Sequence, residues 1–549
     1  MEIAHNRRIL RLDTVIGRAD APRPRLASIF AIFLLLAVVH TWPLATAPQR
    51  LSRNDNADAI LNEWIVAWIA HQAPRDPMHV ADANIYYPEP RTLAYSELLL
   101  PPAIAGAPLA WLGASPVLVY NILVLLGFAA TASAAFVLIH RWTGDWAAGF
   151  VGGVIVAFNA HTLTRLPQLQ ALHLEFLPLA LIAFDRIADN DRTSWRDPAA
   201  LGVCVALQGL TSYYSLVFTC TALAIAWLVR PDAWRRSVAS RVLAAGAIAA
   251  LPLAPMLWIY WRLGVVRPLD EVAQYSAELR DYLATPARMH YGAWSAPFFG
   301  GTTALFPGVT AMALTAVALA SGVLTRDPRA RTALAFGIVG FALSFGPALP
   351  GYAALYHAIP PLQGIRNAAR FGYLAFFAMG ILAGYGLAWI RQRWSRARWL
   401  PFAIAAAIVA ANLDALSAPI EYVDVEAVSP LHAALRGTTA IVAEFPFYPP
   451  DRLFRHAPYL LHSTYHWRPM LNGYSGLAPA SFVEHAQALA RFPDDRAIAT
   501  LRALGVTHVF VHDRALRGWT DNETADAVPG APGLERVGSD GDLALYRVR

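Results

Sequence analysis

The sequence contains repeated apolar runs close to the roughly 20 residues that a helix needs to cross the core of a bilayer. The first runs from Leu26 to Thr46 behind an Arg-rich start. A cleaved signal peptide would have a shorter apolar core and a small-residue cleavage site, so this run is interpreted as a retained helix with its N-terminus in the cytoplasm. The sequence therefore predicts a mainly α, polytopic membrane protein with about eleven spans. The later spans are expected at residues 117–140, 147–161, 171–188, 198–211, 213–228, 240–260, 306–324, 333–345, 371–390 and 400–416.

Composition supports a membrane protein and argues against a nucleic-acid-binding one. Of the 549 residues, 56% are hydrophobic and 15% are charged, whereas soluble domains carry about 25% charged residues. The net charge of +6 could suit nucleic acid, but the arginines cluster beside apolar segments and form no basic face of their own. Cys204 and Cys220 both lie in apolar segments, so the chain offers neither a disulfide framework nor a zinc knuckle.

Arginine-rich loops predict the orientation of the spans. Because positive loops stay in the cytoplasm, the three richest short loops are placed there. If Leu98–Leu112 crossed the membrane, the number of spans would place these loops on the wrong side. This segment is short and interrupted by prolines, so it is predicted to be a half-inserted helix on the outer side. The loops contain Arg230, Arg235, Arg236 and Arg241; Arg326, Arg329 and Arg331; and Arg391, Arg393, Arg396 and Arg398. The predicted organisation is a cytoplasmic tail (1–25), a transmembrane domain (26–417) with large outer loops at 47–115 and 262–304, and an extracytoplasmic C-terminal domain (418–549).

The C-terminal region has the pattern of a small α/β or α+β domain. Thr439–Phe445 and Val506–His512 are expected to be short strands. Leu534–Val537 and Leu543–Val548 flank a turn and predict a hairpin, and Ser481–Arg491 is expected to be helical.

The charged groups point to chemistry or binding at the outer membrane surface. Ion-coupled transporters carry ionisable residues near the membrane midplane, and the predicted spans hold almost none. The first outer loop contains Asp58 at the start of a short amphipathic helix, with Asn62 and Glu63 spaced to lie near it and Trp64 on another face. A carboxylate here could act as a general base toward an acceptor hydroxyl. The alternative is a helix-capping Asp beside interfacial Trp residues.

Several motifs in a fixed order resemble the GT-C superfamily of multi-span glycosyltransferases, which use polyprenyl-phosphate sugars, and are most similar to a poorly characterised bacterial group. The similarity spans nearly the whole chain. Its motifs are Asp58–Trp68, Asp82–Pro88, Thr92–Glu97, Leu207–Tyr214, Tyr275–Ala277, Asp281–Leu283, Leu305–Gly308, Ile365–Phe371 and Asn472–Gly476.

The resemblance implies a GT-C fold in a bacterial plasma (inner) membrane and a sugar transfer to an extracytoplasmic glycan, lipid or protein. It maps the catalytic carboxylate onto Asp58, with Asp55 or Glu63 as an acidic partner. The expected partners are a polyprenyl-phosphate-linked sugar, the lipid bilayer and the acceptor, without nucleic acid. The alternative function is a non-catalytic envelope-glycan assembly factor or a lipid-linked glycan translocase.

Further outer residues are candidates for binding sugar or phosphate, because an Arg fork suits phosphate and aromatic rings suit sugars. Helix capping, snorkelling and interface anchoring are the alternatives for each of them. The candidates are Glu63, Arg165, His173, Glu175, Tyr213, Tyr214, Arg262, Arg366 and Arg370.

Two histidines in the C-terminal region have a spacing found among zinc ligands on a helix. His462 and His466 are four residues apart, but no HExxH motif or Cys accompanies them, and Pro458 and Pro469 lie nearby. The sequence therefore assigns no metal site and no cofactor, and leaves a divalent metal open.

Overall fold

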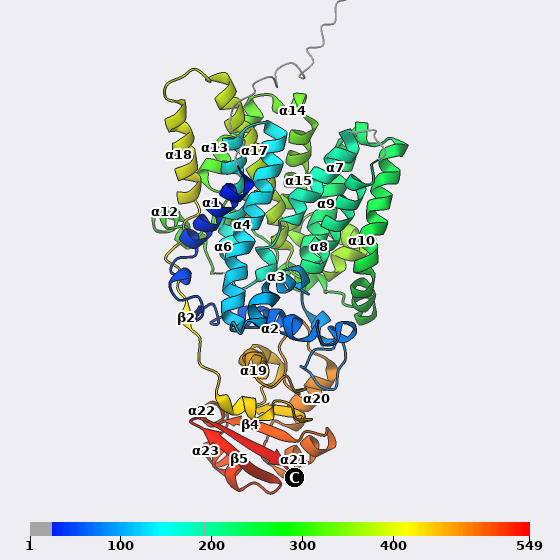
Figure 1. Ribbon diagram of the computed structural model, residues 1–549, viewed down its shortest axis with the longest axis vertical. Helices are drawn as coiled ribbons and strands as arrows, with labels where there is room; N and C mark the ends of the chain where they lie inside the picture. Colours follow the sequence, from blue (N-terminus) through cyan, green and yellow to red (C-terminus); the bar gives the residue numbers. More distant parts are fainter. Residues whose placement is uncertain (1–24, 190–193, 302) are drawn as a thin grey trace, which may run out of the picture.

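The computed structural model describes residues 25–189, 194–301 and 303–549. Residues 1–24 of the N-terminal tail predicted at 1–25, with the arginines before Arg25, lie outside the described residues. A bundle of helices forms one part of the molecule, and the chain after α18 forms a second part at one end of it, here called the C-terminal domain (Figure 1).

Helices occupy the positions of all the predicted spans. They are α1 (Leu26–His40), α4 (Pro116–Thr143), α5 (Trp146–Ala157), α7 (Phe176–Asp189), α8 (Arg196–Thr211), α9 (Tyr213–Val229), α10 (Arg236–Leu263), α13 (Val309–Ala320), α15 (Pro328–Ser344), α17 (Gly372–Arg393) and α18 (Leu400–Leu413). Among the described residues, three helical segments are long and apolar enough to cross a membrane by length and composition: Pro116–Thr143, Arg236–Leu263 and Ala368–Arg393.

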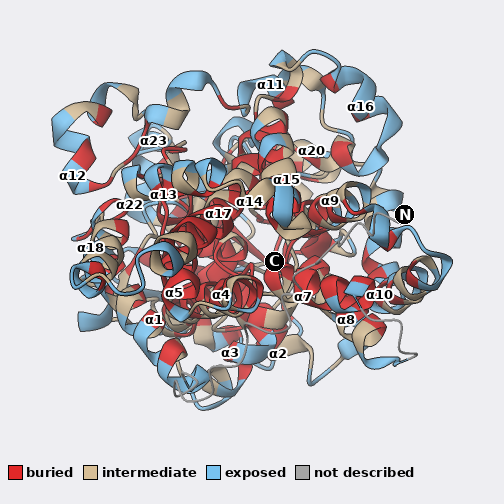
Figure 2. Cartoon of the chain, turned by 90° about the horizontal axis from the view of Figure 1, so that it is seen from above, coloured by how far each residue is buried: buried red, intermediate tan, exposed pale blue. Residues whose placement is uncertain are grey.

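The bundle buries a central group of helices and exposes apolar side chains at its rim. Seen from above, α4, α5 and α17 are mostly buried, while α10 and α18 lie at the edge with many exposed residues (Figure 2). Exposed rim residues include Leu243 at 74%, Leu251 at 81% and Phe402 at 77%. Large apolar side chains on the outer faces of long helices suit a lipid environment. The chain is a multi-pass membrane protein.

Short helices fill the loops between the long ones. The predicted half-inserted segment contains α3 (Leu100–Trp111), whose 12 residues extend only about 18 Å, too short for a bilayer core of about 30 Å. It packs against α2 (Ala57–Gln72), which lies between the bundle and the C-terminal domain (Figure 1). The other short helices are α6 (Ala160–Leu163), α11 (Leu269–Gln274), α12 (Arg288–His290), α14 (Val323–Arg326) and α16 (Tyr352–Ala358).

The C-terminal domain contains a four-stranded mixed sheet in the order β3-β4-β6-β5. β3 (Val442–Phe445) and β4 (His508–His512) pair in parallel, and the predicted hairpin is formed by β5 (Leu534–Asp540) and β6 (Leu543–Val548). The predicted strands and helix are confirmed, the helix as α20 (Ala480–Ala488). Around the sheet lie α19 (Ala457–Ser463), α21 (Asp495–Ala503), α22 (Asp513–Arg517) and α23 (Asn522–Ala527), and a small sheet pairs β1 (Leu51–Ser52) with β2 (Val423–Asp424).

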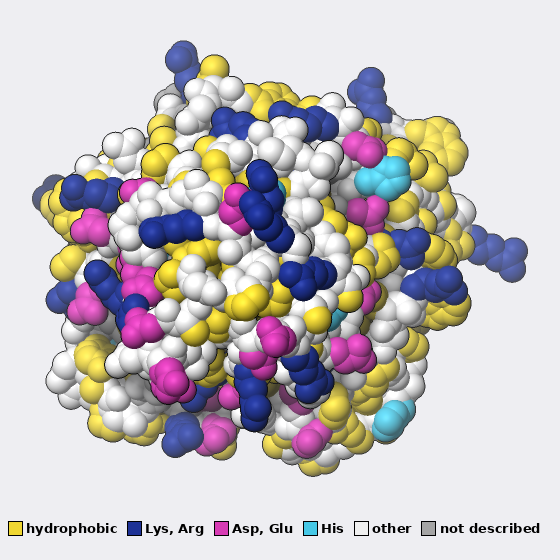
Figure 3. Space-filling view, turned by 90° about the horizontal axis from the view of Figure 1, so that it is seen from below, with side chains coloured by type: hydrophobic (Ala, Val, Ile, Leu, Met, Phe, Trp, Pro, Cys, Tyr) yellow, Lys and Arg dark blue, Asp and Glu magenta, His cyan; other side chains and the backbone are white. Residues whose placement is uncertain are grey.

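Viewed from below, the surface at this end carries Arg and acidic side chains interspersed with apolar ones (Figure 3). Mixed charges of this kind are typical of a surface in contact with water. The surface of the C-terminal domain therefore suits water, whereas the rim of the bundle suits lipid.

A glycine allows two long helices to approach closely. A Cβ atom on Gly386 of α17 would lie 2.0 Å from the backbone oxygen of Leu314 in α13. Backbone cannot move aside as a flexible side chain can, so the two helices can only touch here because residue 386 lacks a side chain. Small residues play this role at many helix contacts within membranes.

We expect Gly386→Ala to lower the thermal unfolding temperature in detergent, because overpacking typically costs about 1–3 kcal/mol. Gly246→Ala in α10 is the matched control, since a Cβ atom there meets nothing within 4 Å. Ala is the better helix former, so the control should unfold at or above the wild-type temperature. Equal unfolding temperatures for the two variants would contradict the close approach of α13 and α17.

Candidate active site

Asp58 lies at the start of α2, at the junction of the bundle and the C-terminal domain. The cap of this helix is Asn56, whose side-chain oxygen accepts a hydrogen bond from the Asp58 backbone N–H at 2.9 Å. The half-buried Asp58 carboxylate instead accepts one hydrogen bond from Gln168 Nε2 and one from the Tyr474 hydroxyl, each at 2.8 Å. The helix-capping role considered for Asp58 therefore belongs to Asn56, and the carboxylate joins three distant segments of the chain.

Asn62 holds the Gln168 segment against α2. Its side-chain amide donates to the backbone oxygen of Asp58 at 2.6 Å and to that of Pro167 at 3.1 Å. One amide thus bridges the first turn of α2 and the residue before Gln168. This contact explains why Asn62, one turn after Asp58, belongs to the site although it does not touch the carboxylate.

The C-terminal domain positions Tyr474 through the loop that precedes it. Asn472 donates to the backbone oxygen of Glu444 at 2.8 Å and accepts from the Glu444 N–H at 2.7 Å, which ties the loop to β3. Gly473 packs on the ring of Tyr86, where a Cβ atom would come within 2.6 Å of the ring. The loop is therefore fixed on both sides before it reaches Asp58.

Arg165 places positive charge near this carboxylate, and Arg370 lies near Arg165. Arg165 is only 7% exposed, and its Nη1 lies 3.5 Å from Gln168 Oε1. Burial and the charge of Arg370 lower the pKa of Arg165 to about 9, while Asp58 and Tyr214 act in the opposite direction. The guanidinium of Arg370 lies over the ring of Tyr214, 4.7 Å from its centre.

These guanidinium groups have unused donors. Within the described residues, Nε and Nη2 of Arg165 and Nε of Arg370 are buried and have no hydrogen-bond partner. Buried donors are rarely left unpaired, because each forfeits its bonds to water. Two neighbouring guanidinium groups with open donors suit an anion that offers several oxygen atoms, as a phosphate does.

Arg366 extends the positive region toward Tyr474, and Tyr214 holds the backbone at Arg366. The Tyr214 hydroxyl accepts hydrogen bonds from the backbone N–H groups of Arg366 and Asn367, both at 3.0 Å. Burial and Asp58 raise the pKa of Tyr474, and the charge of Arg366 opposes this shift. The Arg366 guanidinium lies 4.9 Å from the ring centre of Tyr275.

Glu97 is a nearby carboxylate that the sequence analysis did not assign to the site. It accepts a hydrogen bond from the backbone N–H of Tyr213 at 2.6 Å. Burial raises the pKa of Glu97, while Tyr213 and the charge of Arg370 oppose that shift. The Tyr213 hydroxyl donates to the backbone oxygen of Pro361 at 2.8 Å, so Tyr213 links chain segments. Its place in the motif Thr92–Glu97 was the available signal for Glu97.

Asp55 and Glu63, the expected acidic partners of Asp58, are held by other groups. Asp55 is exposed and forms a two-pronged ion pair with Arg53 at 2.9 and 3.0 Å. Glu63 is fully buried and accepts hydrogen bonds from Ser52 at 2.8 Å and from Asn54 at 3.2 Å. Burial raises the pKa of Glu63 to about 7, against the effect of these two hydrogen bonds.

His173 and Glu175 pair with each other inside the bundle. His173 Nδ1 lies 3.1 Å from Glu175 Oε1, and its Nε2 lies 3.0 Å from the backbone oxygen of Leu123 in α4. The predicted helix at 171–188 begins only at Phe176, which leaves both residues in the preceding loop. Arg262 is exposed at the end of α10, with its guanidinium 5.5 Å from the ring centre of Trp258.

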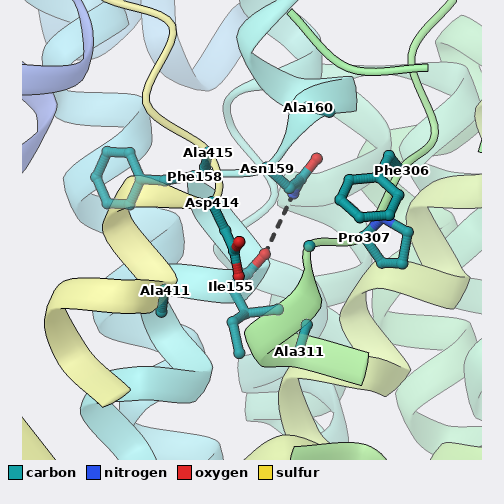
Figure 4. A pocket seen from close by; sticks show the side chains of 11 residues that line it. Ile155, Phe158, Asn159, Ala160, Phe306, Pro307, Ala311, Ala411, Asp414 and Ala415 are labelled. Atoms are coloured by element: carbon teal, nitrogen blue, oxygen red, sulfur yellow. Dashed lines mark hydrogen bonds between the residues drawn. The ribbon is translucent and has the colours of Figure 1, made fainter. Parts of the chain in front are cut away.

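A small pocket lies elsewhere, where α5, α13 and α18 meet (Figure 4). Asp414 in this pocket accepts from the backbone N–H of Thr310 at 2.6 Å and lies 2.9 Å from His290 Nε2. Asn159 turns toward the backbone oxygen of Ile155 (Figure 4). Asp414 and Asn159 therefore have hydrogen-bond partners within the protein, and none of the candidate site residues named above lines the pocket.

Comparison with known proteins shows a likeness in fold to solved structures. No protein-family model matches the sequence, and no curated protein matches it. The arabinofuranosyltransferase AftD from Mycobacteria superposes with a TM-score of 0.63 at 16% identity, over 96% of this chain and 40% of AftD. The chain thus spans less than half the length of AftD.

Two further solved structures share the arrangement. The oligosaccharyltransferase AglB from Archaeoglobus fulgidus, in complex with an inhibitory peptide and a dolichol-phosphate, gives a TM-score of 0.51 at 14% identity, over 95% of this chain and 74% of AglB. ArnT from Cupriavidus metallidurans, bound to undecaprenyl phosphate, gives 0.50 at 12% identity, over 95% and 97%. The chain therefore has the GT-C fold that its sequence motifs predicted.

Proposed function

We propose that the protein transfers a sugar from a polyprenyl-phosphate donor to a hydroxyl group of an extracytoplasmic glycan, lipid or protein. The observation that carries this proposal is the placement of one carboxylate, Asp58, near arginines whose buried donors lack partners. Two proteins of the same fold have structures with polyprenyl phosphates, which supports a lipid phosphate as the anion at these arginines.

In the proposed reaction, Asp58 accepts the proton of the acceptor hydroxyl as its oxygen attacks the anomeric carbon. The bond between that carbon and the phosphate oxygen breaks, and the polyprenyl phosphate leaves with the electron pair. Arg165, Arg370 and Arg366 stabilise the charge on the departing phosphate. Displacement in a single step inverts the anomeric centre.

Gln168 and Tyr474 are proposed to orient the base. Each donates to a different oxygen of the Asp58 carboxylate, which restricts rotation of the group. Such restriction favours one direction of approach for the acceptor. Asp55 and Glu63 are assigned supporting positions in the loop, since each has partners of its own.

The proposed orientation places this site outside the cytoplasm. Nucleotide sugars are cytoplasmic, so an enzyme acting outside needs a donor carried by a lipid. The arginine-rich loops after α9, after α13 and after α17 lie at the end of the bundle opposite the C-terminal domain (Figure 1), as positive loops facing the cytoplasm would.

The orientation predicts that a reporter active only after export, fused after Arg549, gives full signal. The same reporter fused after Arg326, at the other end of the bundle, is the control and should be inactive. Activity measured in intact cells distinguishes the two. A silent fusion after Arg549 with an active fusion after Arg326 would reverse the orientation and place Asp58 in the cytoplasm.

Replacing the arginines should weaken binding of the lipid phosphate. For Arg165→Lys and Arg370→Lys we expect at least about tenfold weaker binding of undecaprenyl phosphate to the purified protein, because Lys lacks the planar fork and a charged hydrogen bond contributes about 1.5–3 kcal/mol. Arg262→Lys is the control, since Arg262 is exposed over Trp258. Equal affinity in all three variants would remove the arginines from donor binding.

Replacing Asp58 should abolish most of the transfer while leaving the lipid donor bound. A general base contributes typically 10²–10⁴-fold, so Asp58→Asn should transfer sugar at least about a hundredfold more slowly. Asp55→Asn should lose less, because Asp55 is exposed and paired with Arg53. The measurement is transfer from radiolabelled polyprenyl-phosphate sugars in membranes that carry each variant.

Three outcomes would contradict the assignment. Loss of transfer in Asp55→Asn with full activity in Asp58→Asn would move the base to Asp55. Full activity in both variants would remove the loop from the mechanism. Wild-type protein that binds the donors and transfers none of them would favour the non-catalytic assembly factor.

A further inference from the structure

Four potential metal ligands converge in the C-terminal domain, away from Asp58. His432 lies in the turn Pro430–Leu435, Glu444 in β3, His462 in α19 and His512 at the end of β4. One ligand atom from each of them lies within 4.8 Å of all the others. Because β3 and β4 are parallel neighbours, the sheet itself brings Glu444 and His512 together.

The carboxylate of Glu444 lies at the centre of the group. Its Oε2 lies 2.9 Å from His462 Nδ1 and 2.8 Å from His512 Nε2. Its Oε1 lies 3.7 Å from His432 Nε2. Tetrahedral zinc, with bonds of about 2.0–2.2 Å, places its ligand atoms roughly 3.3–3.6 Å apart, so small side-chain movements bring these atoms to that geometry.

Two atoms of the group lack a partner. Within the described residues, His432 Nε2 and Glu444 Oε1 are buried and form no hydrogen bond. His432 Nδ1 lies 3.2 Å from the backbone oxygen of Ser429, which can only accept, so this contact places the ring hydrogen on Nδ1. In the neutral ring, the lone pair of Nε2 then faces a carboxylate oxygen, and two buried acceptors oppose each other. A cation between them satisfies both.

The residue types indicate which cation fits. Imidazole nitrogens suit zinc and other first-row transition metals, whereas magnesium and calcium prefer oxygen ligands. The second ring N–H of a histidine ligand commonly donates a hydrogen bond to a carbonyl oxygen, as the Nδ1–H of His432 does to Ser429. His432 and Glu444 are fully buried, and the side chains of His462 and His512 are 18% and 17% exposed, which gives an ion access from one side.

We propose that His432, Glu444, His462 and His512 bind one divalent transition-metal ion, with zinc as the best match to the ligand set. Four protein ligands complete a tetrahedral shell, which is the arrangement of a structural site. The ion joins β3 and β4 to α19 and to the turn at His432. His466, four residues after His462, lies outside the group because α19 ends at Ser463.

The site is tested by the metal content of the full-length protein purified in detergent. We expect about one equivalent of zinc per chain by mass spectrometry. After chelation and reloading with Co²⁺, the wild type should show the visible absorption bands of tetrahedral cobalt. Glu444→Gln and His512→Gln should each lose most of the bound metal.

His466→Gln is the matched control, because His466 is a buried histidine of the same domain that contributes no ligand. It should retain one equivalent. Absence of both stoichiometric zinc and the cobalt bands in the wild type would overturn the proposal without relying on any variant. Equal metal content in the wild type, Glu444→Gln and His512→Gln would overturn it as well, by placing the ion elsewhere.

Discussion

At the junction between the helical bundle and the C-terminal domain, a single carboxylate accepts one hydrogen bond from each part of the molecule. Gln168 reaches Asp58 from the bundle and Tyr474 reaches it from the C-terminal domain. Neither donor could hold its position alone, since Asn62 fixes the segment of Gln168 and Asn472 fixes the loop of Tyr474. The geometry at Asp58 is thus a product of both parts of the molecule.

Arginines at the two ends of the bundle differ in their partners. At the end away from the C-terminal domain, Arg230 forms ion pairs with Asp185 and Asp189 at 2.7 Å each. Arg165 and Arg370, in the candidate site, form no ion pair among the described residues and keep buried donors without partners, whereas Arg230 leaves only its Nε unpaired. Acidic partners satisfy most of the donors of Arg230, whereas guanidinium groups without an acidic partner have capacity for an anionic ligand. This contrast, more than the number of arginines, distinguishes the candidate site.

The long helices could be predicted from the sequence because each one is marked by its own run of apolar residues, without reference to the rest of the chain. The strands of the C-terminal domain followed from alternation and turn residues in the same way. Contacts between distant residues could not be predicted, since Gln168 and Tyr474 lie 110 and 416 positions from Asp58. The spacing of His462 and His466 suggested a helical pair, but the helix ends between them, and the true neighbours of His462 come from other segments.

The separation of Asp58 from Tyr474 also bears on how the protein is made. Ribosomes add roughly 5–20 residues per second, so the 416 positions between the two residues correspond to roughly 20–80 s of synthesis. Throughout that interval Asp58 has been synthesised, but Tyr474, whose hydroxyl donates to its carboxylate, has not. The candidate site on the newly made bundle is therefore incomplete until the last quarter of the chain has folded against it, and this delay separates insertion into the membrane from completion of the site.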